Sequence, residues 1–241
     1  MIHSPYSYSR ISTYKQCPRK FKYHYIDKIK TEEVEHLALS RGGYLHDLIE
    51  HYGGSVSPTI TEIFTIEKVQ ECDLIIDKFL SSNLGKEFVF GSGGIVEIGK
   101  ETEIGLRITK DGVFPCSYHD DKVLVRGAID KLGIMGNVLL IFDWKSGRMK
   151  DPKYFDELQT QIYAIWGFLT FPLIDEIHSH YVYIEHNTSN KYIYKRKYLN
   201  NYINNLKSPI KLAESDKTFN KQESKLCDYC EYQTICEKDN L

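Results

Sequence analysis

The sequence has neither a long hydrophobic run nor an excess of basic residues. Its 241 residues contain no apolar stretch near the roughly 18–20 residues that a transmembrane helix needs, and the polar, tyrosine-containing N-terminus does not resemble a signal peptide. We therefore expect a soluble, cytoplasmic protein with no membrane partner. The net charge of -2 lacks the basic excess common in nucleic-acid-binding proteins, although a basic patch can be local. The phosphate-binding loop G-x-x-x-x-G-K-[ST] is absent, which predicts no dependence on ATP.

The six cysteines do not indicate a disulfide framework, because they are few and unevenly spread for an intracellular chain of this length. Cys227, Cys230 and Cys236 share a C-x2-C-x5-C spacing near the end of the chain. Three thiolates so placed are consistent with zinc or an iron–sulfur cluster, and either requires a fourth ligand. Cys72 is interpreted as a small buried hydrophobe and Cys116, in an expected exposed loop, as incidental.

The region Val123–Gly147 predicts two short strands joined by a glycine-containing turn. The five apolar residues Val138–Phe142 are typical of a strand buried on both faces. We expect the two strands to end in the carboxylates of Asp130 and Asp143, with Lys145 on the same face as Asp143. Two converging carboxylates favour Mg2+ or Mn2+, and an adjacent ammonium group can neutralise charge on a phosphoryl oxygen. The alternative is that these are ordinary charges at strand ends.

The order G-x-x-D, hydrophobic strand, D-W-K-S-G resembles the PD-(D/E)XK nuclease superfamily. More narrowly it resembles the RecB-type branch, which includes CRISPR-associated adaptation nucleases and many phage exonucleases. The resemblance implies that Asp130 and Asp143 are ligands of Mg2+ or Mn2+ and that Lys145 is catalytic. A backbone carbonyl near Trp144 is implied as a further metal ligand. The implied reaction is hydrolysis of a DNA phosphodiester bond by metal-activated water.

Two further site residues follow from the resemblance. His46 lies in an expected helix over residues 36–52 and matches the family histidine that reaches the metal. The alternative is an ordinary solvated or core histidine. The family also places an acidic residue on the strand before the G-x-x-D strand. We select Glu103 for this role, with Glu101 as second choice, in the alternating segment over residues 95–109.

A last motif of the family, Q-x-x-x-Y, matches Gln159 and Tyr163. They lie four residues apart in a helix expected over residues 154–169, and therefore on one helix face. The resemblance implies that both residues are catalytic, orienting the substrate and the metal-bound water, and that Tyr163 also contacts DNA. The alternative is an ordinary half-polar helix face.

The N-terminal segment S-x-S-x-I-x-x-Y-x-x-C-P-R-K-F resembles the start of the family members that carry a [4Fe-4S] cluster. The resemblance implies that Cys17 is the fourth cluster ligand beside Cys227, Cys230 and Cys236. Such a cluster would staple the two ends of the chain and contribute to its folding stability. Zinc is the alternative occupant of the cysteine site.

Basic and aromatic residues alternate after Cys17. Arg19 and Lys20 are predicted to contact DNA phosphates, with the neighbouring rings available for base stacking. The alternative is an amphipathic helix that buries Phe21, Tyr25 and Ile29.

The resemblance implies a single α/β nuclease domain over residues 1–241. We expect a restriction-endonuclease-like central mixed sheet flanked by helices, a helical insertion over 47–94 and a cluster-binding segment over 221–241. The expected function is that of a metal-dependent exonuclease on single-stranded DNA, in recombination, repair or phage DNA processing. The alternatives are a CRISPR adaptation nuclease that trims spacer precursors in a complex and a non-catalytic DNA-binding module. Partners would be DNA, further copies of the chain, or recombination or CRISPR adaptation proteins.

Overall fold

The computed structural model describes residues 5–31, 37–50, 65–147, 149 and 156–238, with side chains of the 37–50 helix from Arg41 onward. The helices and strands are α1 (Tyr8–Gln16), α2 (Pro18–Phe21), η1 (Lys22–Ile26), α3 (Leu37–Glu50), α5 (Ile66–Ser81), α6 (Asn83–Phe88), β1 (Val96–Ile108), β2 (Val113–Cys116), β3 (Val125–Met135), β4 (Val138–Lys145), α7 (Leu158–Thr170), β5 (Glu176–Tyr183), η3 (Ile184–His186), β6 (Thr188–Lys195), η4 (Arg196–Tyr198), α8 (Leu199–Ser215), η5 (Cys227–Tyr229) and α9 (Gln233–Lys238).

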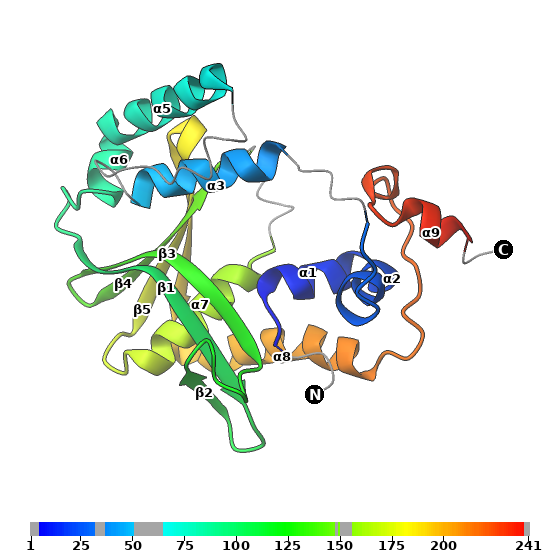
Figure 1. The fold of residues 1–241 in the computed structure, drawn as a ribbon. Helices are drawn as coiled ribbons and strands as arrows, with labels where there is room; N and C mark the ends of the chain where they lie inside the picture. Colours follow the sequence, from blue (N-terminus) through cyan, green and yellow to red (C-terminus); the bar gives the residue numbers. More distant parts are fainter. Residues whose placement is uncertain (1–4, 32–36, 51–64, 148, 150–155, 239–241) are drawn as a thin grey trace. The chain divides into compact units, whose positions relative to one another are not determined.

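Six strands form one mixed sheet in the order β2-β1-β3-β4-β5-β6 (Figure 1). β3 and β4 are antiparallel, whereas β4 and β5 are parallel and are joined through α7. A parallel pair requires such a crossover, because a short hairpin connects only antiparallel strands. The predicted α/β fold with a mixed sheet flanked by helices is confirmed.

The chain divides into two compact units, so the predicted single domain over residues 1–241 stays a prediction. One unit comprises Glu35–Glu103 and Ala128–Leu199, and the other comprises Met1–Val34, Ile104–Gly127 and Asn200–Leu241. All the residues of the predicted nuclease site belong to the first unit, and all four predicted cluster cysteines belong to the second.

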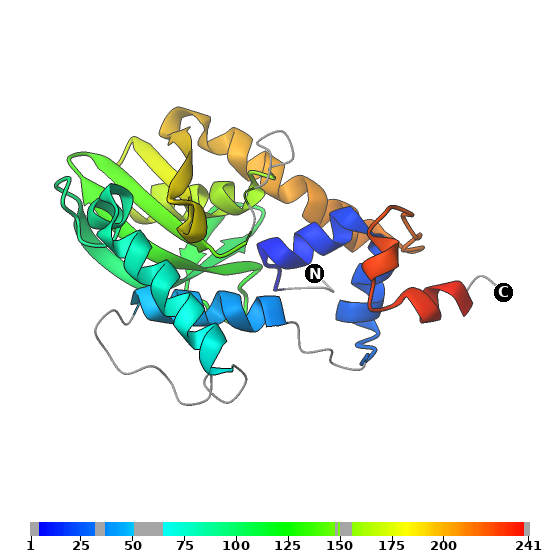
Figure 2. The ribbon, with the colours of Figure 1, turned by 90° about the horizontal axis from the view of Figure 1, so that it is seen from above.

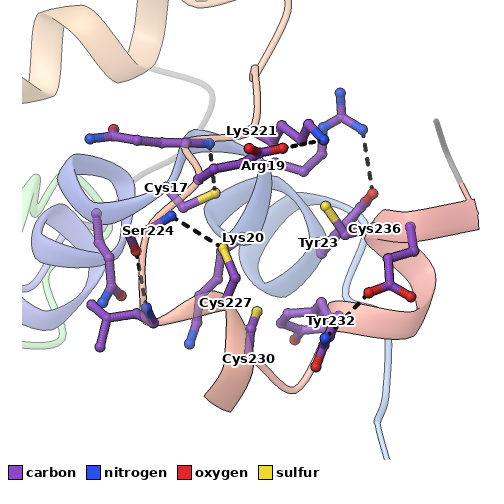
Figure 3. A pocket seen from close by; sticks show the side chains of 16 residues that line it. Cys17, Arg19, Lys20, Tyr23, Lys221, Ser224, Cys227, Cys230, Tyr232 and Cys236 are labelled. Carbon is purple, nitrogen blue, oxygen red and sulfur yellow. Dashed lines mark hydrogen bonds and ion pairs between the residues drawn. The ribbon is translucent and has the colours of Figure 1, made fainter.

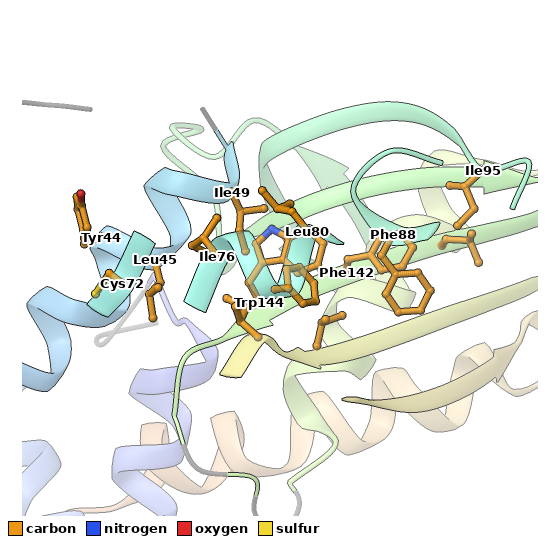
Figure 4. Packing of buried hydrophobic residues seen from close by; sticks show 14 residues of the cluster. Tyr44, Leu45, Ile49, Cys72, Ile76, Leu80, Phe88, Ile95, Phe142 and Trp144 are labelled. Carbon is orange, nitrogen blue, oxygen red and sulfur yellow. The ribbon is translucent and has the colours of Figure 1, made fainter. Parts of the chain in front are cut away.

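In the first unit, α3, α5 and α6 cover one face of the sheet, and α3 and α5 lie side by side (Figures 1 and 2). Alternate residues of β4, namely Leu140, Phe142 and Trp144, belong to one buried cluster with Leu45 and Phe79. Figure 4 shows Phe142 and Trp144 in this cluster. Figure 4 also shows Cys72 within the cluster, and its full burial confirms the prediction of a small core hydrophobe. The helices α5 and α6 lie within the predicted helical insertion over 47–94, which stays a prediction, while residues 51–64 lie outside the described part.

The helix α7 covers the opposite face of β4 and β5. It packs closely at Gly167, where an added Cβ would lie 2.8 Å from side-chain atoms of both Leu139 and Ile177. The residues Leu158–Phe168 of this helix are buried at most positions, including Tyr163 and Ile165. Odd-numbered residues of β4 therefore point toward α7, and this alternation carries Asp143 and Lys145 to that face.

In the second unit, the chain before α1 forms a bridge to the start of β3. The Tyr6 amide donates to the Leu124 carbonyl at 2.6 Å, and the buried Tyr6 hydroxyl donates to Glu214 of α8 at 3.0 Å. Ser7 caps α1 by accepting a hydrogen bond from the Arg10 amide.

Two sequence-based expectations were wrong. β3 continues past Asp130 to Met135, so this carboxylate lies inside a strand rather than at its end. Cys116 ends strand β2 opposite Gly105 instead of lying in a loop, because the chain from Val113 to Cys116 pairs with β1. Within the described residues, no helix is both long and apolar enough to cross a membrane.

Candidate active site

Asp130 and Asp143 lie on neighbouring antiparallel strands, directly beyond the register pair Lys131–Phe142. The backbone amide of Trp144 donates to Asp130 Oδ2 at 2.6 Å, so the end of β4 fixes the orientation of the Asp130 carboxylate. Asp143 is only 4% exposed. The sequence therefore brings two carboxylates together, as predicted, although one of them comes from the middle of a strand.

Burial makes this pair of carboxylates electrostatically costly. It raises the pKa of Asp130 well above its ordinary value, and the neighbouring charges of Asp143 and Glu101 raise it further, while the hydrogen bond from the Trp144 amide opposes the rise. Two buried carboxylates that repel each other are stabilised in their charged forms by a cation between them. The donor set thus fits a hard divalent metal ion, which prefers oxygen ligands.

Lys145 and Gln159 close a network around Asp143. The Lys145 ammonium forms an ion pair with Asp143 Oδ2 and lies 3.5 Å from Gln159 Oε1. The Gln159 amide donates to Asp143 Oδ1 at 3.0 Å and to the Tyr163 hydroxyl at 2.9 Å, and that hydroxyl donates to the Ala128 carbonyl at 2.7 Å. Burial, and then the charge of Asp143, raise the pKa of Tyr163 well above its ordinary value. Tyr163 is therefore a neutral support for Gln159, and at 4% exposure it offers little surface to DNA.

His46 reaches the carboxylates from α3, which is held against the sheet by the buried side chains Leu45 and Ile49. Its Nδ1 atom lies 3.7 Å from Asp130 Oδ2. Burial lowers the pKa of His46, against the opposing effects of Asp143 and of a hydrogen bond with the Trp144 backbone. A neutral imidazole is the form that ligates metal ions.

The two acidic candidates of β1 differ in their relation to the site. Glu101 is the one whose charge acts on Asp130, and its backbone has a φ of 41°, in the left-handed region. Glu103 is exposed and lies in the regular part of the strand. The sequence alone did not separate the two, because strict alternation predicts the same face for both, whereas the local backbone distortion at Glu101 is a property of the fold.

In the part of the chain that the structure describes, no three His, Cys, Asp or Glu side chains stand in position to hold a metal ion. At the carboxylates the reason is visible. One oxygen of Asp143 faces the Lys145 ammonium, and one oxygen of Asp130 faces the Trp144 amide. The Trp144 side chain is buried in the core, so its backbone is the part of this residue that can belong to the site.

The four predicted cluster cysteines, Cys17, Cys227, Cys230 and Cys236, line one cavity of about 310 Å³ (Figure 3). None of them forms a disulfide. Backbone amides face two of the sulfur atoms, with Gln222 N donating to Cys17 Sγ at 3.5 Å and Ser224 N donating to Cys227 Sγ at 3.4 Å. The two ends of the chain thus meet around a common pocket of thiols.

Arg19 and Lys20, predicted to contact DNA, line the same cavity. Arg19 donates to the Phe219 carbonyl at 3.0 Å, and Lys20 forms an ion pair with Glu231 at 2.8 Å. Both side chains are engaged in holding the N-terminal and C-terminal segments together. Of the three residues predicted to be buried beside them, Phe21 is buried, whereas Tyr25 and Ile29 are only partly so.

Sequence reasoning missed Tyr181 of β5. Its hydroxyl donates to Gln159 Oε1 at 3.2 Å, and its ring lies beneath the Lys145 ammonium, 4.9 Å from the ring centroid. Finding it required the pairing of β4 with β5, which aligns Tyr181 with Asp143.

A mixed sheet that carries paired carboxylates, a lysine on the same strand face and a supporting glutamine defines a metal-dependent phosphodiesterase type of site. The family model of the PD-(D/E)XK nuclease superfamily matches residues 5–237, and the chain therefore belongs to this superfamily of nucleases. Membership implies a DNA substrate and a divalent metal such as Mg2+.

A structure with a TM-score above 0.5 shares the fold, and a second similar structure has a lower score. A provisionally assigned exonuclease from Eubacterium rectale is 14% identical, with a TM-score of 0.55, over 95% of this chain and 87% of that one. The protein SSO0001 is 15% identical, with a TM-score of 0.40, over 94% of this chain and 84% of that one. No curated protein matches the chain.

Proposed function

We propose that this nuclease is an exonuclease that hydrolyses single-stranded DNA with Mg2+ or Mn2+ at Asp130 and Asp143. The observation that carries the proposal is the convergence of two buried carboxylates, Lys145 and Gln159 within one hydrogen-bonded network. The assignment of the structural neighbour from Eubacterium rectale as an exonuclease supports the choice of an end-dependent reaction.

The side chains divide the chemistry between them. Asp130, Asp143 and the neutral His46 would hold the metal ion, with the Trp144 carbonyl and an acidic residue of β1 as further ligands. The bound metal supplies a water of lowered pKa and neutralises charge on the phosphoryl oxygens.

Lys145 stabilises the charge that develops on the phosphate, from a position set by Asp143 and Gln159. Gln159 orients the Asp143 carboxylate by donating to Oδ1, and Tyr163 keeps Gln159 in place. For the acidic residue of β1, the sequence-based choice was Glu103, and the charge that acts on Asp130 now favours Glu101.

The test is cleavage of end-labelled single-stranded and double-stranded DNA, linear and circular, with Mg2+, Mn2+ or EDTA. Degradation of linear single strands that stops in EDTA and in the variant Asp143→Asn supports the proposal. The matched control is Asp175→Asn, since Asp175 is an exposed carboxylate that precedes β5 and pairs with Arg196, outside this network. Unchanged cleavage by Asp143→Asn would refute the metal role.

The other outcomes distinguish the remaining functions. Cleavage of circular DNA, which has no ends, would show that the enzyme is an endonuclease. Activity that requires an added integrase complex would favour the CRISPR adaptation role and identify partner proteins. DNA binding without cleavage under all metal conditions would favour the non-catalytic module.

We infer in addition that the four cysteines bind a [4Fe-4S] cluster rather than a single zinc ion. The cluster is favoured because the segment around Cys17, together with the C-x2-C-x5-C spacing, resembles the family members that carry such a cluster. The four cysteines line one pocket together with other residues of the two terminal segments. Amide donors at Cys17 and Cys227 also suit thiolate sulfurs.

Anaerobic purification followed by iron, sulfide and zinc analysis tests this inference. We expect a brown, iron-containing protein that loses its iron in Cys17→Ser and keeps it in the control Cys116→Ser, because Cys116 lies in β2 and does not line the cavity. Stoichiometric zinc would establish that the four cysteines bind zinc. The absence of both iron and zinc would refute the inference that a metal group joins the two ends of the chain.

A further inference from the structure

We propose that Tyr181 is a positioning residue of the nuclease site, which fixes the amide of Gln159 and the ammonium of Lys145 relative to Asp143. The inference rests on the proposed function, since it concerns the same site. The Q-x-x-x-Y pair and the D-x-K pair have sequence motifs, whereas Tyr181 lies on a different strand and belongs to neither.

The register of the sheet places Tyr181 next to the site. β4 and β5 are parallel, and Asp143 is the register partner of Tyr181. Both side chains point to the face that α7 covers, where Gln159 lies on the first turn of the helix. Tyr181 is 3% exposed and makes an edge contact with Tyr192 of β6, with ring centroids 5.7 Å apart. Its ring is therefore held before any substrate arrives.

The Tyr181 hydroxyl supports the observed orientation of the Gln159 amide. Gln159 Oε1 lies 3.2 Å from this hydroxyl and 3.5 Å from Lys145 Nζ, so two donors converge on one acceptor. The amide nitrogen is left to donate to Asp143 Oδ1. A flipped amide would turn its NH2 group toward the Lys145 ammonium, which can only donate, and its oxygen toward the Asp143 carboxylate, which can only accept. The Tyr181 hydroxyl adds a donor to the observed orientation.

The Tyr181 ring acts on Lys145 separately from the hydroxyl. The ammonium lies 4.9 Å from the ring centroid, within the range of a cation–π contact. It is held between this ring and the Asp143 carboxylate. Lys145 is about a third exposed, so the ring limits the orientations of an otherwise mobile side chain. A rigid support of this kind is what a charge-stabilising group requires.

A matched control exists on the next strand. Tyr194 of β6 is also 3% exposed, and its hydroxyl hydrogen-bonds to Thr160 of α7 at 2.6 Å, one residue away from Gln159. Tyr181→Phe and Tyr194→Phe therefore each remove one buried hydroxyl that contacts α7. Only the first removes a hydroxyl from the network around Asp143.

The experiment measures kcat and KM for DNA cleavage, and the Kd of Mn2+ for the protein without DNA, in both variants. By analogy with other outer partners of metal ligands, we expect Tyr181→Phe to lower kcat about 10-fold to 100-fold. We expect KM to change less than about twofold and Mn2+ affinity to fall several-fold. Tyr194→Phe should stay within about twofold of wild type in all three quantities. In a Gln159→Ala background, Tyr181→Phe should have no further effect, because the hydroxyl acts through the amide.

Equal behaviour of the two tyrosine variants, or multiplicative effects of Tyr181→Phe and Gln159→Ala, would overturn the inference. A wild-type protein that binds Mn2+ but cleaves no DNA would refute the proposed function, and the Mn2+ affinities alone would then decide on Tyr181. A wild-type protein that neither binds Mn2+ nor cleaves DNA would overturn both.

Discussion

Replacing Glu101 should increase the stability of the folded chain and reduce its cleavage of DNA. The φ of 41° at Glu101 lies in a region that costs a residue with a Cβ atom about 1–2 kcal/mol. Glycine relieves this strain but loses about 0.5–1 kcal/mol through the greater freedom of the unfolded chain. Glu101→Gly should therefore raise the free energy of unfolding by about 0.5–1 kcal/mol, with a further small gain from removing a negative charge beside Asp130.

Glu103 is the matched comparison, two residues along the same strand and exposed. It is not among the residues of positive φ in the described part of the chain, so glycine there relieves no strain. Glu103→Gly should lower the free energy of unfolding by about 0.5–1 kcal/mol. Urea denaturation of the two variants at one pH measures the difference, for which we expect opposite signs.

The two positions should also differ in their effect on DNA cleavage, with the loss expected at Glu101. If Glu101 is the third carboxylate of the metal site, Glu101→Gln should reduce metal-dependent cleavage by about 100-fold or more, beyond the range seen for outer partners of metal ligands. Glu103→Gln should leave it nearly unchanged. The reasoning fails if Glu101→Gly is as destabilising as Glu103→Gly, or if Glu103→Gln abolishes cleavage while Glu101→Gln does not.

Three other predictions concern stability and DNA binding. Burial lowers the pKa of His180 to about 4 in the folded chain. The stability of the folded chain should therefore fall by about 3 kcal/mol as the pH decreases from about 6.5 toward 4. Urea denaturation at several pH values should show this dependence lost in His180→Phe and kept in His119→Asn. An added Cβ at Gly105 would lie 2.6 Å from a backbone oxygen, so Gly105→Ala should destabilise the folded chain by about 1–3 kcal/mol. Gly43 lies on an open helix surface, so Gly43→Ala should stabilise the folded chain by up to about 1 kcal/mol, as measured by thermal unfolding. Lys20→Ala should change the free energy of unfolding by less than about 1 kcal/mol and leave the salt dependence of DNA binding unaltered. If the slope of log K against log salt falls by about 0.7–0.9 in this variant, Lys20 contacts a phosphate as predicted.

The elements with strong local patterns were predictable from the sequence. The five apolar residues Val138–Phe142 gave β4, because a strand buried on both faces has no polar positions. The polar residues that immediately follow, Asp143 and Lys145, then had to share a face, and the structure places both against α7. Gln159 and Tyr163 could be paired for the same reason, since residues four apart on a helix are neighbours.

The failures arose where tertiary contacts decide the local structure. An ordinary half-polar helix face was the alternative for Tyr163, yet α7 is buried on nearly all sides because it is the crossover of a parallel strand pair. The predicted strand end at Asp130 depended on the glycine that follows it at position 133. That glycine is instead accommodated inside β3, where an added Cβ would lie 2.6 Å from the Ile95 side chain.

The DNA contact of Lys20 stays a prediction, and the local sequence could not indicate what the other end of the chain would supply to this side chain. A run of basic and aromatic residues is compatible with phosphate contacts and with a docking surface for acidic residues, and local sequence does not separate the two. The structure supplies Glu231 for Lys20 and the Phe219 carbonyl for Arg19. Both partners come from more than 190 positions away, and the same long closure gathers the four cysteines.

The position of Tyr181 shows why motif reasoning reaches only part of such a site. Motifs connect residues through fixed spacing along one strand or one helix, as for Asp143 with Lys145 and for Gln159 with Tyr163. Tyr181 is 36 positions after Lys145, and its relation to Asp143 exists only through the parallel register of β4 and β5. A one-residue slip of that register would turn Tyr181 to the opposite face of the sheet and leave Gln159 Oε1 with the Lys145 donor alone. The precision of the site therefore depends on sheet register as much as on the catalytic residues, and any variant that loosens the β4–β5 pairing should impair cleavage before it unfolds the chain.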